Sequence, residues 1–209
     1  MKKVKVVVAV ILVIISLIIA KNIVETNKVE TSESTPGIES IPTVKAEEII
    51  DTPKLTTTYT SLGVPNINSS FKTWMSHRAV TNKRSPQYKF INKWGWADSE
   101  GFMRCSGERD LGIDQDYYLI ALGSYYGTTI GTKYRITLDT GKVFYGALAD
   151  CKNNKHTNST NQYVPKNGNI VEFLVDTPNL NKAVKRTGSA NNYPPLNGQV
   201  VKIEKIDFV

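Results

Sequence analysis

The sequence predicts a mainly β fold, on the strength of three observations made between residues 116 and 175. Apolar runs of similar length recur there, at Asp116–Gly123, Gly127–Leu138, Val143–Ala149 and Asn169–Val175. These runs are rich in Val, Ile, Tyr and Phe, whose branched and aromatic side chains suit a pleated, half-buried surface. Gly, Asp and Asn separate them, as expected for tight turns between strands. We therefore expect neighbouring strands rather than a helical bundle.

Turn signals and two further strands complete this β region. Asp139-Thr-Gly141 lies between two apolar runs and predicts a hairpin, and Asn167-Gly168 predicts another tight turn. Phe102–Cys105 is expected as a short strand, and Gln199–Phe208 is expected as the strand that closes the domain. The core of the expected β domain is therefore placed at about residues 114–209.

One short helix is expected ahead of the strands, as a cover for an open face or end of the domain. Phe71, Trp74 and Met75 fall at i, i+3 and i+4, the spacing of one helix face, and Ser69 or Ser70 can cap it. His77 lies just beyond this stripe and is expected to be exposed or packed.

The next segment alternates and predicts a strand over Tyr88–Trp96, which places Trp94 and Trp96 on one strand face. Two neighbouring indoles offer a surface on which sugar rings can stack, so both residues are candidates for substrate binding. The alternative, that they belong to the core, remains open at this point.

The N-terminus predicts a membrane anchor. Lys2, Lys3 and Lys5 precede the apolar run Val6–Ala20, and Lys21 follows it. We assign residues 1–24 to a single transmembrane helix that holds the rest of the chain outside the cell, because the basic start faces inward. A cleaved signal peptide is the alternative, although Ile18-Ile19-Ala20 is a poor cleavage site.

Residues 25–60 predict a disordered extracellular linker between this anchor and a folded domain at residues 61–209. The linker is rich in Glu, Ser, Thr and Pro and has almost no aromatic residues. Such a segment buries too little apolar area to offset the entropy of ordering it. It would hold the domain away from the membrane.

The distribution of charge narrows the range of partners. Residues 1–60 hold seven basic and seven acidic residues, so the whole net charge of +7 falls in residues 61–209. A basic exported domain suggests peptidoglycan or an anionic wall polymer as its partner, with no nucleic acid expected, unless the excess of positive charge serves solubility alone.

The two cysteines leave two alternatives open. Cys105 and Cys151 are an even pair that would form a disulfide outside the cell or remain two free thiols.

Acidic residues supply the candidates for catalysis. Asp150 ends an apolar run, and Glu172 interrupts the apolar segment Ile170–Val175, where alternation places it on one face with Ile170 and Leu174. A carboxyl among apolar side chains tends toward a raised pKa, which suits a general acid. His156, in the long polar loop after Asp150, is a candidate substrate contact. No nucleotide-binding or zinc motif is present, so no cofactor or metal is expected.

Four short segments together resemble a known family. Ile120–Gly123, Thr129–Ile136, Leu148–Asp150 and Gly168–Phe173 are similar to the motifs of the three-aspartate domain. That domain is a double-psi β-barrel, similar to the barrels of membrane-bound lytic transglycosylase A and rare lipoprotein A. The resemblance implies a six-stranded barrel in which an aspartate serves as acid and base for cutting the glycan strand of peptidoglycan without water. The chain also resembles uncharacterised exported proteins of Gram-positive bacteria.

Matched residue by residue, the resemblance assigns Asp150 to the second aspartate. Glu172 stands at the third position, and Gly123 stands where the first aspartate is expected. Three functions stay open from sequence: a peptidoglycan-cleaving enzyme that uses Asp150 and Glu172, a wall-polymer or glycan-binding module, and a structural part of an envelope assembly.

Overall fold

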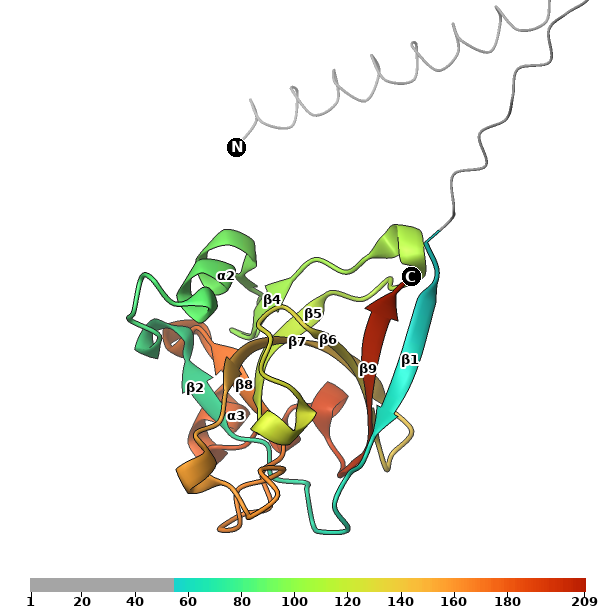
Figure 1. Ribbon diagram of the computed structural model, residues 1–209. Coiled ribbons are helices and arrows are strands. Elements are labelled where there is room, and N and C mark those ends of the chain that lie inside the picture. Colours follow the sequence, from blue (N-terminus) through green and yellow to red (C-terminus); the bar gives the residue numbers. More distant parts are fainter. Residues whose placement is uncertain (1–54) are drawn as a thin grey trace, which may run out of the picture. The chain divides into compact units, whose positions relative to one another are not determined.

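The protein folds into a mainly β structure with one mixed sheet and few helices (Figure 1). The structure is a computed structural model that describes residues 55–209. Nine strands form the sheet: β1 (Thr57–Leu62), β2 (Trp74–Ser76), β3 (Trp96–Ala97), β4 (Met103–Cys105), β5 (Tyr117–Leu122), β6 (Lys133–Leu138), β7 (Val143–Cys151), β8 (Glu172–Val175) and β9 (Val200–Phe208). The α-helices are α2 (Pro86–Trp94) and α3 (Lys182–Thr187), and short 3-10 turns connect the remaining elements.

The strand order is β1-β9-β6-β7-β5-β4-β3, with β8 paired to β5 and β2 paired to β8. Most neighbours are antiparallel, but β5 runs parallel to β7, and β2 runs parallel to β8. The end strands β1 and β3 do not pair with each other in this part of the chain. The expected closed six-stranded barrel is therefore replaced by a curved nine-stranded sheet whose hydrogen-bonded path stays open.

Strand β5 lies at the centre because it is apolar on both faces. All six of its residues, Tyr117 to Leu122, are buried. Ile120 and Phe173 belong to one core cluster, whereas Leu119 and Leu174 belong to the other. A strand buried on both faces reads as a continuous apolar run, which is how this segment appears in the sequence.

The predicted β elements are largely confirmed. β6 and β7 pair antiparallel around the turn at Asp139–Gly141. Gly141 adopts φ +78°, and its amide donates to the carbonyl of Leu138 at 2.9 Å. β4 falls within the predicted strand Phe102–Cys105, and β9 matches the predicted closing strand.

Two predictions for the segments before β4 are wrong: the helix expected around Phe71–Met75 and the strand expected over Tyr88–Trp96. The Phe71–Met75 segment is instead extended and leads into β2, because its backbone forms hydrogen bonds with distant parts of the chain. For example, the carbonyl of Lys72 accepts from Ala190 N at 2.7 Å. The alternating segment is instead α2, whose start is fixed by Ser85, since its hydroxyl accepts from Tyr88 N, and by a proline in the first turn. α2 buries Ile91 in the same cluster as Leu119.

Of the two alternatives for Cys105 and Cys151, the structure shows two free thiols and no disulfide. Their strands lie on opposite sides of β5, where Cys105 pairs with Tyr117 and Cys151 pairs with Leu122. At about 3.3 Å per residue, these two positions on β5 are roughly 16 Å apart along the strand. A disulfide requires Cα atoms within about 7 Å, so the sheet register itself keeps the thiols apart.

The predicted anchor at residues 1–24 lies outside the described residues, as does the linker as far as residue 54. β1 begins at Thr57, inside the segment assigned to the linker, and it pairs along its whole length with β9. Between residues 55 and 209, no helix has the length and apolar character needed to cross a bilayer.

Candidate functional site

Strand β5 brings the two predicted acidic residues together. Ala121 on β5 pairs with Asp150 of β7 on one side and with Glu172 of β8 on the other. Residues opposite each other in a sheet point to the same face, so both carboxyl groups emerge on the face of Ala121. With strands about 4.8 Å apart, the two Cα atoms are roughly 10 Å apart.

A β-bulge determines which way Asp150 points. Ile120 pairs with Leu148, but the next residue, Ala121, pairs with Asp150, which leaves Ala149 as the extra residue of β7. Without this bulge, Ala121 would face Ala149, and Asp150 would turn to the opposite side of the sheet. The irregularity therefore places Asp150 beside Glu172.

Lys152 is the third member of this site, and the sequence analysis missed it. Its side chain is only 3% exposed, and its ammonium lies 3.5 Å from Oε2 of Glu172. Burial lowers the pKa of Lys152, and the negative charge of Glu172 opposes that shift. The spacing of two residues after Asp150, which predicts the same strand face, was the available signal.

The surroundings of Glu172 therefore differ from the purely apolar setting expected from sequence. Leu174 lies in the core cluster on the same sheet face as Glu172, as the alternation predicts. Ile170 does not, because β8 begins only at Glu172, and Ile170 packs with Phe173 in the other cluster. A buried ammonium beside the carboxylate stabilises its charged form.

Asp150 remains half-buried and partly engaged. Its Oδ1 accepts a hydrogen bond from the amide of Cys151 at 2.9 Å. Its Oδ2 has no hydrogen-bond partner among residues 55–209. One carboxyl oxygen is thus fixed by the backbone, and the other is available to a ligand, which is the arrangement that a proton-transferring carboxyl needs.

The other predicted site residues are not brought to this pair. His156 is exposed in the turn Asn154–His156, and its side chain makes no hydrogen bond within the described part of the chain. Trp94 ends α2 and Trp96 begins β3, so they do not share a strand face. Both indoles are nevertheless solvent-accessible, at 55% and 40% exposure, so the interpretation of them as core residues is wrong.

The backbone around Gly123 leaves no room for a side chain at this position. A Cβ atom at this residue would lie 2.0 Å from the carbonyl oxygen of Asn161, far inside van der Waals contact. Asn161 belongs to the polar loop after β7 and has φ +56°. The loop therefore occupies the space that an aspartate side chain at residue 123 would need.

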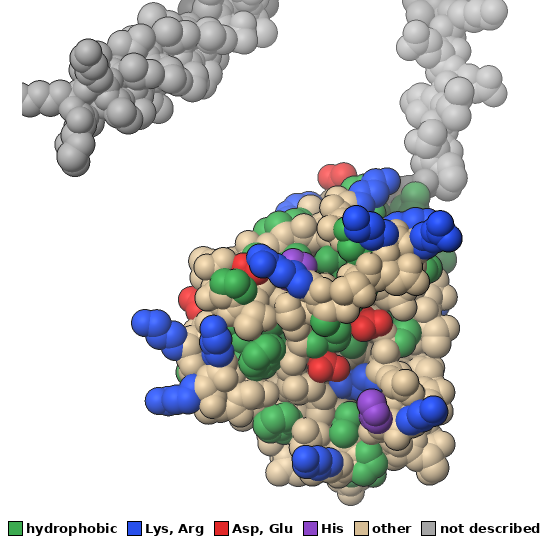
Figure 2. All heavy atoms as spheres, turned by 90° about the vertical axis from the view of Figure 1, so that its left-hand side faces the viewer, with side chains coloured by type: hydrophobic (Ala, Val, Ile, Leu, Met, Phe, Trp, Pro, Cys, Tyr) green, Lys and Arg blue, Asp and Glu red, His purple; other side chains and the backbone are tan. Residues whose placement is uncertain are grey.

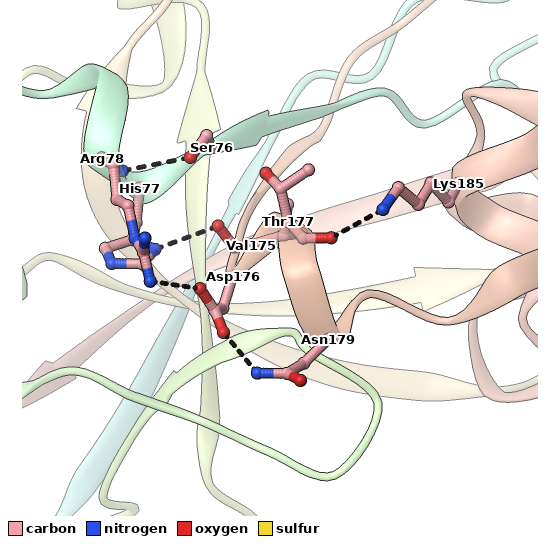
Figure 3. A network of polar contacts seen from close by, with 8 residues as sticks. All are labelled: Ser76, His77, Arg78, Val175, Asp176, Thr177, Asn179 and Lys185. Carbon is pink, nitrogen blue, oxygen red and sulfur yellow. Dashed lines mark hydrogen bonds and ion pairs between the residues drawn. The ribbon is translucent and has the colours of Figure 1, made fainter.

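A second polar network lies beyond the other end of β8 and serves a structural role (Figure 3). Asp176 accepts from Arg78 at 3.2 Å and from the Asn179 amide at 2.6 Å, and His77 Nδ1 lies 3.1 Å from the carbonyl of Val175. These contacts tie the ends of the parallel strands β2 and β8 together. Both Asp176 oxygens are engaged, so the network offers no free carboxyl.

The surface around these elements is mixed in charge. On the side shown in Figure 2, Lys and Arg side chains lie mostly around the rim, whereas acidic side chains occur both near the centre and at the edges, with hydrophobic groups among them. Asp150 and Glu172 line none of four open cavities of about 270 to 630 Å³ found among residues 55–209. Asp150 is half-buried and the Glu172 side chain is 22% exposed, so the acidic pair is partly accessible at the surface.

No protein-family model, curated protein or solved structure matches this chain.

Proposed function

We propose that the protein is a membrane-anchored extracellular cell-wall protein whose domain cleaves the glycan strand of peptidoglycan as a lytic transglycosylase does. The observation that carries this proposal is the shared pairing of Asp150 and Glu172 with Ala121. Carboxyl groups roughly 5–10 Å apart flank the scissile bond in most glycosidases, and two strands flanking a third provide that range. The resemblance to the three-aspartate domain points to the same reaction.

In this reaction Asp150 acts as both acid and base. Its protonated carboxyl gives the proton to the glycosidic oxygen as the bond from that oxygen to the anomeric carbon breaks. The C6 hydroxyl of the same sugar then attacks the anomeric carbon and returns its proton to the Asp150 carboxylate. A 1,6-anhydro sugar and a free hydroxyl on the departing sugar result, and no water is consumed.

Glu172 contributes charge rather than a proton in this scheme. Its carboxylate lies 3.5 Å from the buried ammonium of Lys152. A carboxylate near the reacting ring stabilises the positive charge that develops there in an oxocarbenium-like transition state. Glu172 is thus assigned to electrostatic stabilisation, and Asp150 to proton transfer.

The location follows from the sequence. The apolar run Val6–Ala20 is flanked by lysines, which favours a single-pass anchor with the domain outside the cell. The net charge of +7 favours contact with an anionic wall polymer.

A second candidate function is binding without cleavage. The exposed indoles of Trp94 and Trp96 favour it, because aromatic rings at a protein surface are suited to stacking on sugars. In that case the domain would hold the wall without cutting it.

The two functions are separated by incubating the full chain with purified sacculi. We expect soluble anhydro-muropeptides, detected by mass spectrometry, that disappear with Asp150→Asn. Asp114→Asn is the matched control, since Asp114 is exposed and forms no ion pair within residues 55–209. Retention on sacculi without release of fragments would instead support the binding function, and unchanged release by Asp150→Asn would contradict the role of Asp150.

A further inference from the structure

A mainly apolar cavity lies towards the other end of β5 from Ala121. It has a volume of about 270 Å³ and borders the loop after β4. Its lining comes from α2, β4, that loop and β6, namely Phe90, Trp94, Cys105, Ser106, Gly107, Glu108 and Lys133. Neither Asp150 nor Glu172 is part of it, so it is separate from the acidic pair.

Lys133 is the central cation of this cavity. Its side chain is 15% exposed, and its ammonium lies 4.2 Å from the ring centre of Tyr117. Its one hydrogen bond within the described chain is to Sγ of Cys105, at 3.6 Å. Because an ammonium has three N–H donors, Lys133 retains donors for a ligand in the cavity.

Glu108 faces the same ammonium at a distance that leaves room for another atom. Its Oε1 lies 3.7 Å from Nζ of Lys133, which is too long for a direct hydrogen bond. An oxygen atom about 2.8 Å from both groups fits between them. A hydroxyl there would accept from the ammonium and donate to the carboxylate, so the pair is suited to a ligand hydroxyl.

The loop that carries Glu108 is held in place by its own contacts. Asp116 accepts from the amide of Gly107 at 3.2 Å and from the guanidinium of Arg109 at 2.7 Å. Glu108 lies between these two anchored residues. Its position opposite Lys133 is therefore set before any ligand arrives, which reduces the entropy cost of binding.

The apolar wall of the cavity comes from one face of α2. Phe90 and Trp94 are four residues apart on this helix and are therefore neighbours on its surface. The indole of Trp94 is 55% exposed, and the ammonium of Lys93 lies over one face of its ring at 4.6 Å, so a sugar ring would stack on the other face. Tyr125 has a similar exposure of 48% but does not line the cavity, and this makes it a natural control.

The cavity continues towards β9. A second open cavity of about 530 Å³ shares Glu108 and Lys133 with the first. Its further lining carries hydroxyl and charged side chains from the segment before β6 and from β9, including Thr129, Thr132, Lys205 and Asp207. Ligand sites usually measure roughly 300–1,000 Å³, so the two cavities together offer room for more than one sugar ring.

We propose that these two cavities form a saccharide-binding groove, the Lys133 groove, in which a pyranose ring stacks on Trp94 and one of its hydroxyls bridges Lys133 and Glu108. The aromatic wall selects a ring with an apolar face, and the ion pair selects a hydroxyl that can both accept and donate. The proposal rests on the proposed function for the class of ligand, a glycan, but uses none of the residues assigned to cleavage.

The test is isothermal titration calorimetry of the N-acetylglucosamine tetramer into the full chain carrying Asp150→Asn, so that the ligand is not consumed. We expect saturable binding that Trp94→Ala weakens by about tenfold, the loss of one ring-stacking contact. Lys133→Met, which keeps the side-chain length, should weaken binding by about tenfold through the lost hydrogen bond. Tyr125→Ala should change the affinity by less than about twofold, because Tyr125 lines neither cavity.

Two outcomes overturn the groove: no saturation up to about 10 mM tetramer, or equal losses from Trp94→Ala and Tyr125→Ala. Circular dichroism of each variant establishes that it is folded, and Trp94 is exposed enough for its replacement to leave the core intact. Cleavage of sacculi without tetramer binding contradicts the groove alone. Tetramer binding without cleavage contradicts the proposed reaction alone.

Discussion

The ammonium of Lys152 lies 3.5 Å from Oε2 of Glu172, although the lysine side chain is only 3% exposed. Removing one member of a buried pair leaves the other charge without its partner, which costs far more than the loss of a surface ion pair. The stability of the domain should therefore depend on this pair more than on the other ion pairs of the sheet.

Glu172→Gln should lower the free energy of unfolding by about 3 kcal/mol because it leaves Lys152 buried beside a neutral amide. The double variant Glu172→Gln with Lys152→Met should recover part of that loss. Urea denaturation followed by tryptophan fluorescence measures both. Lys205→Met is the control, since Lys205 is 42% exposed where it meets Asp207, and its loss should cost about 1 kcal/mol or less. Equal effects of Glu172→Gln and Lys205→Met would contradict the buried pair.

Gly123→Ala should destabilise the domain more than Gly141→Ala does. A Cβ at residue 123 meets the Asn161 carbonyl at 2.0 Å, whereas a Cβ at residue 141 meets nothing within 4 Å. The second change carries only the backbone strain of its positive φ, about 1–2 kcal/mol. Melting temperatures provide the comparison. Gly123→Asp, whose side chain is larger still, should be at least as harmful as Gly123→Ala.

The two thiols should remain independent under oxidising conditions. We expect the intact mass of the folded chain to match two free cysteines and a reducing agent to leave the melting temperature unchanged. Iodoacetamide should label Cys151 before Cys105, because Cys105 is buried and Cys151 is partly exposed. A fall in melting temperature on reduction, or protection of both residues, would show that they pair after all.

Lys72 should make stability rise with pH in alkaline solution. Its ammonium is surrounded by the carbonyls of Ser70 and Gly198 and the amide oxygen of Asn191. Burial lowers its pKa from 10.5 to about 8, and Asp139 opposes the shift. Between these values the unfolded chain binds more protons than the folded one, so stability rises as pH increases from about 8 to 10.5.

The Lys72 contribution is isolated by comparison with Lys72→Met. The difference in unfolding free energy between the unchanged chain and this variant should shift in favour of the unchanged chain across that interval. The comparison is needed because burial also raises the pKa values of Tyr117, Tyr126 and Tyr134. Above the ordinary pKa of tyrosine, these three side chains make the stability of the domain fall as pH rises. A difference that stays constant with pH would mean that Lys72 is not buried as a charged group.

The strands could be predicted from sequence because their signals are local. The all-apolar run of β5 and the hairpin glycine at residue 141 each specify their element without help from distant residues. The structure of the Phe71–Met75 and Tyr88–Trp96 segments could not be predicted in this way. Each is so short that its apolar residues fit both the 3.6-residue repeat of a helix and the two-residue repeat of a strand. Lys72 and Thr73 become extended through hydrogen bonds to segments about a hundred residues away, including the one that Thr73 N donates to Oδ1 of Asn169 at 3.3 Å.

Asp150 and Glu172 could each be predicted from the sequence as candidate residues, but their position on one face of the sheet could not. Nothing in Leu148–Asp150 indicates that Ala149 is the extra residue of a bulge, yet that bulge decides which face Asp150 occupies. The distance between Cys105 and Cys151 likewise depends on where their strands pair along β5, and spacing in the sequence does not reveal that. Lys152 escaped notice because a lysine in a polar loop is ordinarily solvated.

Strands β1 and β9 run antiparallel from end to end, and Thr56 exchanges backbone hydrogen bonds with Val209 at 2.6 and 3.0 Å. The two extremities of the folded region are therefore adjacent (Figure 1). A few glycines joining Val209 to Thr56 would permit a circular permutant with new ends opened in the exposed Asp139–Gly141 turn. The same adjacency makes C-terminal trimming hazardous, because each residue removed from β9 unpairs its neighbour in β1.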